Sequence, residues 1–440
     1  MNSQSKFSRR TALGALATAT GSLFLRSLAT GIPSSVLLDP LSAHAGTEPT
    51  AKTLILASSI SGDPMNANVP GTYDFPANEV FHPAAPSMAK TSLTLSGKTF
   101  SAAKPWADLG QGILDRTTFF HHATYTPVHG ELGLVQKMMR ATEKDDMLIS
   151  LISRELAPLL KTVQSDPLSL GASGGELLSA EGRILGNVSP LSVQRALGGP
   201  EGPLKDLTAL RDQQIDEIYA LYREHGTPSQ LKLLDSWTRS RKEVRSIGLS
   251  LVERLAAIDG NDQVNQLRCA AVLAAMNIAP VITVHLGFGG DSHGDTDFEQ
   301  ETEDTVITLN DVHTFIDELD QLKADGHLKQ DVIFATLNTF GRTLKKNGTD
   351  GRDHNEGHHV MLMIGNGIQG GVVGGIEPTA NGSDYQATTI NSTTGEKGGD
   401  ISFEESLAAA GKTLAFALGV PQARVDAMID GGKVVQSVIA

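Results

Sequence analysis

VITVHL at residues 281–286 and DVIFATL at residues 331–337 are short apolar runs of the length and composition of buried strands. Between them, residues 301–324 have a helical pattern with acidic first turns, which suits the positive end of a helix dipole. Strands that alternate with helices are typical of layered α/β proteins with a parallel sheet. This stretch therefore predicts a layered α/β fold with a largely parallel sheet.

The same alternation extends on both sides of that stretch. Apolar runs at residues 52–60, 117–123 and 360–365 predict further strands. We also expect helices over residues 145–160 and from about Gly130 to Arg140. Residues 46–440 are thus predicted to form a three-layer α/β/α sandwich with a mostly parallel central sheet. Helical periodicity over about 206–279 predicts a helical insertion of two or three helices in this domain.

The N-terminus has the order of features of a twin-arginine export signal. Arg9 and Arg10 follow a short polar start, and residues 12–28 form a mild apolar stretch that is too weak and too short to span a membrane. Ala43-His44-Ala45 supplies the small-x-small pattern that a signal peptidase needs. Residues 1–45 are therefore predicted to be a signal peptide, with the twin-arginine translocase and signal peptidase as partners and a periplasmic or secreted location. The alternative is a basic tail that is retained.

Composition excludes several classes of partner. The chain has 50 acidic and 36 basic residues, a net charge of −14, and no long basic run after the signal, so nucleic acid is not expected. No later apolar run is long enough for a stable membrane anchor. Cys269 is the single cysteine and lies in an apolar helical pattern, which favours a buried core position over a catalytic thiol.

Polar side chains collect where the predicted strands end, which is where open α/β sheets form ligand sites. Carboxylates and imidazoles without thiolates suit a divalent metal such as Zn, Mn, Mg or Fe, and two metals can clamp both sides of a displacement at phosphorus or sulfur. No spacing here matches a diagnostic motif, so each histidine can also be a surface or supporting residue. The residues in question are Asp63, Asn66, His121, His122, Thr124, Thr126, His129, Asp291, His293, Asn338, Arg342, Asp353, His354, His358 and His359.

Three segments carry a resemblance to a known family. Residues 63–70 (DPMNANVP) resemble a D-G-L-N-t-v-v-P segment, and residues 288–294 (FGGDSHG) resemble g-g-f-D-t-H. Residues 340–374 contain FGRT, NG, GRDH and GIQGGVVG in the order of the third and most specific block. Together they resemble the bacterial family called domain of unknown function 1501, over residues 52–430. Members of that family often carry twin-arginine signals.

The resemblance implies a fold similar to the alkaline phosphatase and sulfatase superfamily. Proteins of that superfamily hold one or two metals with Asp and His at strand ends, and use a Ser, Thr or modified Cys as nucleophile. Residue by residue, the motifs imply the metal ligands Asp63, Asp291, His293, Asp353 and His354.

The nucleophile is where this chain departs from the pattern. Relatives often have Ser immediately before the histidine that matches His129, whereas this chain has Val128. Thr126 is nearby but not at the matching position, and a metal-activated water is the alternative. The candidates for catalysis are Thr126, His129 and Arg342. Arg342 can either clamp an anionic substrate or anchor its own loop by pairing with an aspartate.

Two functions follow. The first is an exported, metal-dependent hydrolase acting on a small phosphate or sulfate ester, as the retained Asp and His set favours. The second is a non-catalytic envelope binding or scaffold protein on the same fold, as Val128 favours. The acidic net charge makes an anionic polymer a less favourable substrate than a small anionic ester.

Overall fold

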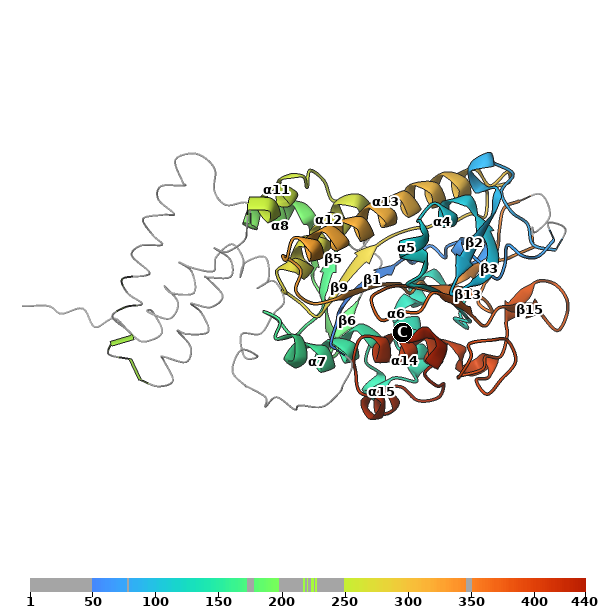
Figure 1. Ribbon diagram of the computed structural model, residues 1–440. Coiled ribbons are helices and arrows are strands. Elements are labelled where there is room, and N and C mark those ends of the chain that lie inside the picture. Colours follow the sequence, from blue (N-terminus) through green and yellow to red (C-terminus); the bar gives the residue numbers. More distant parts are fainter. Residues whose placement is uncertain are drawn as a thin grey trace, which may run out of the picture. The chain divides into compact units, whose positions relative to one another are not determined.

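The computed structural model describes residues 50–76, 79–171, 178–197, 249–345 and 350–440, with a few isolated positions between 217 and 227 (Figure 1). The predicted signal peptide and about half of the predicted helical insertion lie outside these residues. The chain divides into two compact units, residues 1–41 with 188–261 and residues 42–187 with 262–440. In the first unit, the described helices α8 (Pro190–Leu197) and α11 (Leu249–Ala256) contact each other.

The second unit is built on a mostly parallel sheet. Strand β1 is hydrogen-bonded in parallel to β10 on one side and to β9 on the other, and β5 continues the parallel set. Strand β13 runs antiparallel to both of its neighbours, β10 and β4, so β4 has the same direction as the parallel strands. The order is β14 (Gly371–Val373), β4 (Thr117–His122), β13 (His359–Gly365), β10 (Val332–Thr336), β1 (Thr53–Ser58), β9 (Val281–His285), β5 (Leu168–Leu170) and β8 (Asn187–Val188).

Helices cover both faces of this sheet (Figure 1). Helices α12 (Gln263–Ala275) and α13 (Glu299–Ala324) lie on one face, and α7 (Leu148–Leu160) and α14 (Ser406–Ala417) lie on the other. The predicted α/β class with a mostly parallel central sheet is therefore confirmed. Shorter helices are α3 (Met65–Asn68), α4 (Lys104–Ala107), α5 (Gln111–Leu114), α6 (Leu132–Gln136) and α15 (Gln422–Met428).

Four two-stranded ribbons complete the described structure. Of these, the ribbon of β11 (Gly341–Arg342) and β12 (His354–Asn355) matters most for the site, because its two strands pair Arg342 with His354. The others are β2 (Lys90–Leu95) with β3 (Lys98–Ala103), β6 (Ser179–Ala180) with β7 (Arg183–Ile184), and β15 (Ile376–Pro378) with β16 (Tyr385–Ala387).

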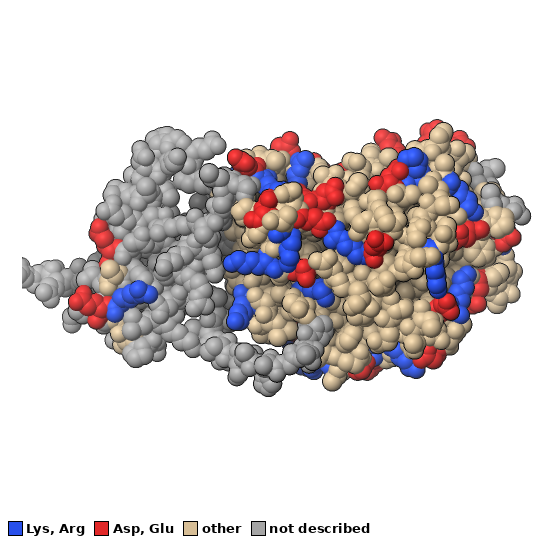
Figure 2. Space-filling view, in the orientation of Figure 1, with Lys and Arg blue, Asp and Glu red and all other residues tan. Residues whose placement is uncertain are grey.

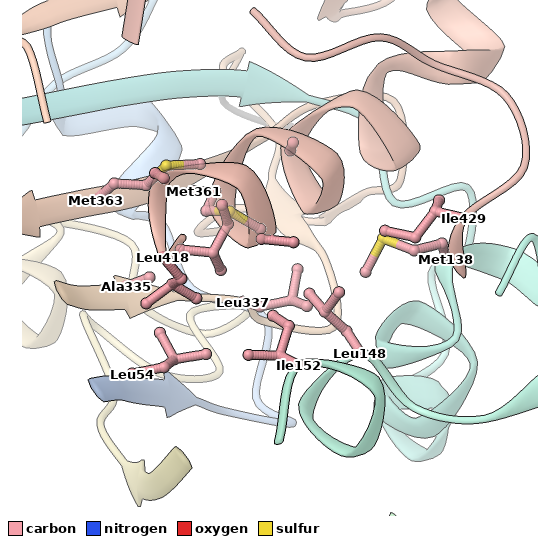
Figure 3. Packing of buried hydrophobic residues seen from close by; sticks show 14 of the residues in the cluster. Leu54, Met138, Leu148, Ile152, Ala335, Leu337, Met361, Met363, Leu418 and Ile429 are labelled. Atoms are coloured by element: carbon pink, nitrogen blue, oxygen red, sulfur yellow. The ribbon is translucent and has the colours of Figure 1, made fainter. Parts of the chain in front are cut away.

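The main hydrophobic core lies between the sheet and the α7 and α14 layer. Figure 3 shows Leu54, Ala335 and Met361 on three neighbouring strands, facing Ile152 of α7 and Leu418 at the end of α14. All five side chains are at most 2% exposed. Burial of a Leu, Ile or Met side chain contributes roughly 1.5–3 kcal/mol, and this helps to hold the strands in the register that brings their ends together.

One predicted helix is wrong. The pattern from Gly130 to Arg140 predicts a continuous helix, but α6 ends at Gln136 and residues Met138, Met139 and Arg140 have φ values of 47°, 54° and 72°. The reason is tertiary packing. Met138 is buried against α14, where the missing side chain of Gly411 leaves room for its sulfur atom. This contact overrides the helical propensity of the segment.

The surface is consistent with the composition. Figure 2 shows acidic and basic side chains interspersed over the face in view. Among the described residues, no helix is both long and apolar enough to cross a membrane. Cys269 is buried in α12, as predicted, and burial raises the pKa of its thiol well above the usual value.

Candidate metal centre

Four side chains from distant parts of the chain meet at one edge of the sheet. His129, Asp291, His293 and His354 each offer a ligand atom, and these atoms all lie within 4.8 Å of one another. The Nε2 atoms of His293 and His354 are 2.8 Å apart, and His293 Nε2 is 3.6 Å from Asp291 Oδ1. His129 Nε2 lies 3.9 Å from Asp291 Oδ2.

Strand direction explains why these residues meet. Strands β1, β4, β9 and β10 run the same way, so their carboxyl ends share one edge of the sheet. His129 follows β4, and Asp291 and His293 follow β9. His354 comes after β10 and shortly before β13, which begins at this edge because it is antiparallel. The site is thus at the place where α/β sheets bind ligands.

Two main-chain carbonyls fix the ring nitrogens that face the site. His129 Nδ1 lies 2.7 Å from the carbonyl oxygen of Ile60, and His354 Nδ1 lies 2.5 Å from that of Pro127. A carbonyl oxygen only accepts hydrogen bonds, so both Nδ1 atoms must donate. In the neutral rings, the lone pairs are then on the Nε2 atoms, which face the shared centre. Metal-binding histidines are commonly held in this way.

The protonation of His354 agrees with this arrangement. Burial lowers the pKa of His354 below its usual value, and the positive charge of Arg342 lowers it further. The hydrogen bond to Pro127 opposes this effect only in part. His354 is therefore neutral at pH 7 and can donate its Nε2 lone pair.

Arg342 holds the carboxylate of the group. Its guanidinium is fully buried and donates to the carbonyl oxygens of Ser61 and Gly62 and to Asp291 Oδ1 at 2.9 Å. Burial tends to raise the pKa of Asp291, but the Arg342 guanidinium, assisted by His293 and His129, outweighs this effect and lowers it. In this arrangement Arg342 anchors its surroundings and presents no exposed surface for clamping an anion.

Phe340 fills the space behind the two imidazoles. Its ring centroid lies 4.9 Å from that of His129 and 4.2 Å from that of His354. Gly62 makes this possible, since a Cβ atom there would lie 1.8 Å from the Phe340 ring, and its φ of +70° also favours glycine. The loop after β1 therefore supports the site although it supplies no ligand atom to the group.

The structure places the other residues predicted for the site around this group. Asp63 is fully buried and accepts a hydrogen bond from Asn338 Nδ2 at 2.6 Å, outside the group. Asp353 lies at the edge, with Oδ1 at 3.6 Å from His293 Nδ1 and its side chain 53% exposed. Three of the five predicted metal ligands thus come together, and His129, predicted as catalytic, joins them.

Thr126 points elsewhere. Its hydroxyl donates to Glu131 and accepts the backbone N–H of Val128 at 3.2 Å, and the residue is 2% exposed. The side chain therefore stabilises the turn before α6. Val128, at the position where relatives often have Ser, is 49% exposed.

The remaining strand-end histidines are buried within the sheet layers. His122 and His359 are paired in register on β4 and β13, while His121 and His358 lie on the opposite face and are hydrogen-bonded to each other. Burial is the main cause that lowers the pKa of each of them, to about 3 for His121 and about 4 for His122. The sequence identified them as strand-end residues but did not distinguish them from ligands.

The donor set fits a divalent transition metal. A tetrahedral ion at about 2.1 Å from its ligands requires ligand atoms about 3.4 Å from one another. The two imidazole nitrogens of His293 and His354 are closer than that, at 2.8 Å. The distances from the two Asp291 oxygens are slightly longer, at 3.6 Å from Oδ1 to His293 and 3.9 Å from Oδ2 to His129. Three imidazoles and one carboxylate suit Zn, Fe or Mn better than Mg or Ca, which prefer oxygen ligands alone.

Comparison with known proteins gives limited similarity. No curated protein matches the chain. Among solved structures, the integral membrane protein lipooligosaccharide phosphoethanolamine transferase A (EptA) from Neisseria meningitidis is 11% identical, with a TM-score of 0.35. The match covers 97% of this chain but only 65% of that one, which is less than two thirds of its length.

A family model matches the part of the chain that holds most of the site. Residues 253–393 match the family described as "Protein of unknown function (DUF1501)". This segment includes Asp291, His293, Arg342 and His354, while His129 lies outside it. The similarity to this family that the motifs indicated is therefore confirmed for residues 253–393.

Proposed function

We propose that the protein is a metal-dependent hydrolase that acts on a phosphate or sulfate ester outside the inner membrane. The observation that carries the proposal is the convergence of three imidazoles and one carboxylate at the strand ends, two of the imidazoles having Nδ1 committed to main-chain carbonyls. A divalent metal bound there would polarise the ester and lower the pKa of a water molecule.

The chain's own residues have distinct tasks in this proposal. His129, His293, His354 and Asp291 would hold the metal, and Arg342 keeps Asp291 ionised and oriented. Asp353 is the exposed carboxylate beside His293 and can accept a proton from an incoming water molecule. Water is the nucleophile that we favour, because the Thr126 hydroxyl is buried and bonded to Glu131.

The second candidate is a non-catalytic binding or scaffold protein of the cell envelope. The exposed Val128 and the fully buried Arg342 guanidinium favour it, since neither a hydroxyl nucleophile at that position nor that cation is available to a substrate. A protein of this kind would hold metal without cleaving esters, so metal content and turnover must be measured separately.

Removal of two ligands is expected to abolish metal binding. His293→Ala combined with His354→Ala leaves two of the four donors, and we expect metal affinity to fall by at least about 100-fold, because loss of a supporting residue alone costs 10–100-fold. Mass spectrometry of the purified exported protein should find about one Zn, Mn or Fe in the wild type and almost none in the variant.

A surface histidine provides the control. His313→Ala removes an imidazole on α13 that pairs only with Asp317 among the ion pairs of the described residues, so metal content should stay at the wild-type level. Aryl phosphate and aryl sulfate esters then test turnover. A wild-type protein that holds no metal after growth in metal-replete medium, and cleaves neither ester, would rule out the hydrolase. Metal without cleavage would favour the second candidate.

Export is expected to depend on the paired arginines. In Arg9→Lys with Arg10→Lys, we expect the protein to stay in the cytoplasm with residues 1–45 attached, whereas the wild type is found outside with Gly46 at its N-terminus. Cell fractionation and the mass of the intact protein measure both. Arg26→Lys, a matched change within the apolar stretch, should be exported normally, and export of the double variant at the wild-type rate would contradict the assignment.

A further inference from the structure

Asn66 lies directly against the ribbon that carries Arg342 and His354. Its side-chain oxygen accepts the backbone N–H of Arg342 at 2.9 Å, and its Nδ2 donates to the carbonyl oxygen of Arg342 at 2.8 Å. The amide thus bonds both main-chain groups of Arg342, as a neighbouring strand would. Asn66 is fully buried in α3 and touches none of the four candidate ligands in these bonds.

The contact requires a glycine in the ribbon. A Cβ atom at Gly341 would lie 2.8 Å from Cγ of Asn66 and 2.2 Å from the carbonyl oxygen of His358. Both distances are shorter than real Cβ contacts, so only glycine allows the amide to approach the strand this closely. Gly341 is therefore required for Asn66 to form its hydrogen bonds with Arg342.

Two buried histidines continue the hydrogen bonds from Asn66. His121 Nε2 lies 2.9 Å from the carbonyl oxygen of Pro70 and must donate to it. In the neutral ring, His121 Nδ1 is then an acceptor, so His358 Nε2 donates to it at 2.9 Å. His358 Nδ1 is in turn an acceptor and receives the Asn66 amide at 3.1 Å. Every ring nitrogen of His121 and His358 thus has a hydrogen-bond partner, and each has a fixed role as donor or acceptor.

A glycine also leaves room for His121, which lies at the end of the hydrogen-bond network farthest from Arg342. A Cβ atom at Gly71 would lie 2.8 Å from His121 Nε2, and Gly71 has a φ of +92° that favours glycine. Both histidines are completely buried, and burial keeps them neutral. A neutral pair cannot reverse the direction of its hydrogen bonds without breaking them, so the pair fixes the Asn66 amide in one orientation.

Arg342 and His354, which face each other in the ribbon, link this network to the metal centre. They are paired in register on β11 and β12, and Thr343 N donates to the carbonyl oxygen of Asp353 at 2.9 Å. Arg342 then fixes Asp291, and His354 is one of the candidate ligands. A shift of the ribbon would therefore move two of the four donors relative to the other two.

We propose that Asn66, His358 and His121 are positioning residues for the metal centre, which set the place of the β11–β12 ribbon and through it of Asp291 and His354. This inference rests on the proposed metal-dependent function. Loss of these hydrogen bonds is expected to loosen the ribbon and to weaken and distort metal binding, while the sheet itself remains folded.

The test uses Co²⁺ as a probe, because its visible absorption bands report coordination geometry as well as affinity. Asn66→Ala and His121→Phe are each compared with the wild type, and His122→Phe is the matched control. His122 is the next residue of β4, is equally buried, and lies on the opposite face, where its Nδ1 bonds to the carbonyl of Ala123. We expect Co²⁺ affinity to fall about 10–100-fold, with altered bands, in the first two variants only.

Hydrogen exchange of the metal-free proteins gives a readout that does not depend on metal. Peptides that cover β11 and β12 should exchange faster in Asn66→Ala and His121→Phe, while those from β1 and β9 should exchange at the wild-type rate. His121→Phe decides the matter if Asn66→Ala does not fold. Wild-type Co²⁺ affinity and bands in the variants overturn the inference, as does unchanged exchange of the ribbon. A wild type that binds no Co²⁺ overturns the proposed function instead, and exchange alone then decides whether the network holds the ribbon.

Discussion

Acidification from pH 7 to about pH 4.5 is expected to remove most of the folded protein's stability. Besides His354 at the site, burial is the main cause that lowers the pKa of five histidines, to about 3 for three of them, to about 4 for His122 and well below the usual value for His358. The three at about 3 are His82, His121 and His359.

Whether stability rises or falls with pH depends on which state, folded or unfolded, binds more protons. In the folded protein these rings stay neutral until the pH approaches their lowered pKa values, whereas in the unfolded chain they are protonated as the pH falls through about 6.5. Their contribution to stability is complete above that pH and is lost progressively below it. Each fully engaged histidine costs about 1.4 kcal/mol per pH unit, so five approach about 7 kcal/mol per unit. Typical total stabilities are about 5–15 kcal/mol.

Urea unfolding at a series of pH values from 7.5 to 4.5 measures this effect. The slope of the unfolding free energy against pH should approach several protons near pH 5. In a variant with His122→Phe and His359→Phe, the slope should fall by about two protons at the same pH. A slope of one proton or less in the wild type would show that the buried rings are not neutral in the way the structure indicates.

Replacement of Glu301 is expected to destabilise the folded protein strongly. Glu301 and Arg352 are both fully buried, and their side chains are joined at 2.7 and 3.2 Å. In Glu301→Gln, Arg352 keeps its bonds to the carbonyls of Thr343 and Phe81 but loses its only carboxylate partner among the ion pairs of the described residues. Breaking one side of a buried ion pair costs about 3–5 kcal/mol.

A neighbour on the same helix serves as the control. Glu303→Gln makes the same chemical change two residues further along α13 at an exposed position and should alter the unfolding free energy by less than about 0.5 kcal/mol. Urea unfolding at pH 7.5 compares the three proteins. If Glu301→Gln were as stable as Glu303→Gln, the buried pair would not be the constraint on Arg352 that the structure indicates.

The sequence was sufficient to predict the layers of helices and strands but not the direction of every strand. The runs at 281–286 and 331–337 form parallel strands, as predicted, and the structure places them on either side of β1. The run at 360–365 is equally apolar, and nothing in its pattern indicates that β13 is antiparallel. The helix expected up to Arg140 was wrong because the packing of Met138 against Gly411 is a contact between residues far apart in sequence.

For the site, the rule that ligands gather at strand ends indicated the region, and the motifs selected Asp291, His293 and His354 within it. The rule also included His129, and the structure brings the ligand atoms of these four residues together. The strand-end rule could not show that Asp63 accepts a hydrogen bond from Asn338, because the burial of Asp63 depends on how the loop folds around it. The sequence placed Asn66 near Asp63 after the first strand but gave it no role, since its partners are main-chain atoms of residue 342, far along the chain.

The carbonyls that orient His129 and His354 have a consequence for how this site can vary among relatives. Each hydrogen bond is made by the main chain of Ile60 or Pro127, so a different side chain at position 60 would leave that bond intact. Position 127 is more restricted, because the proline ring limits the backbone angles that aim its carbonyl. Related proteins can therefore keep the same imidazole geometry with another apolar side chain at position 60, which packs against the core, and a search for invariant side chains would overlook this hydrogen bond.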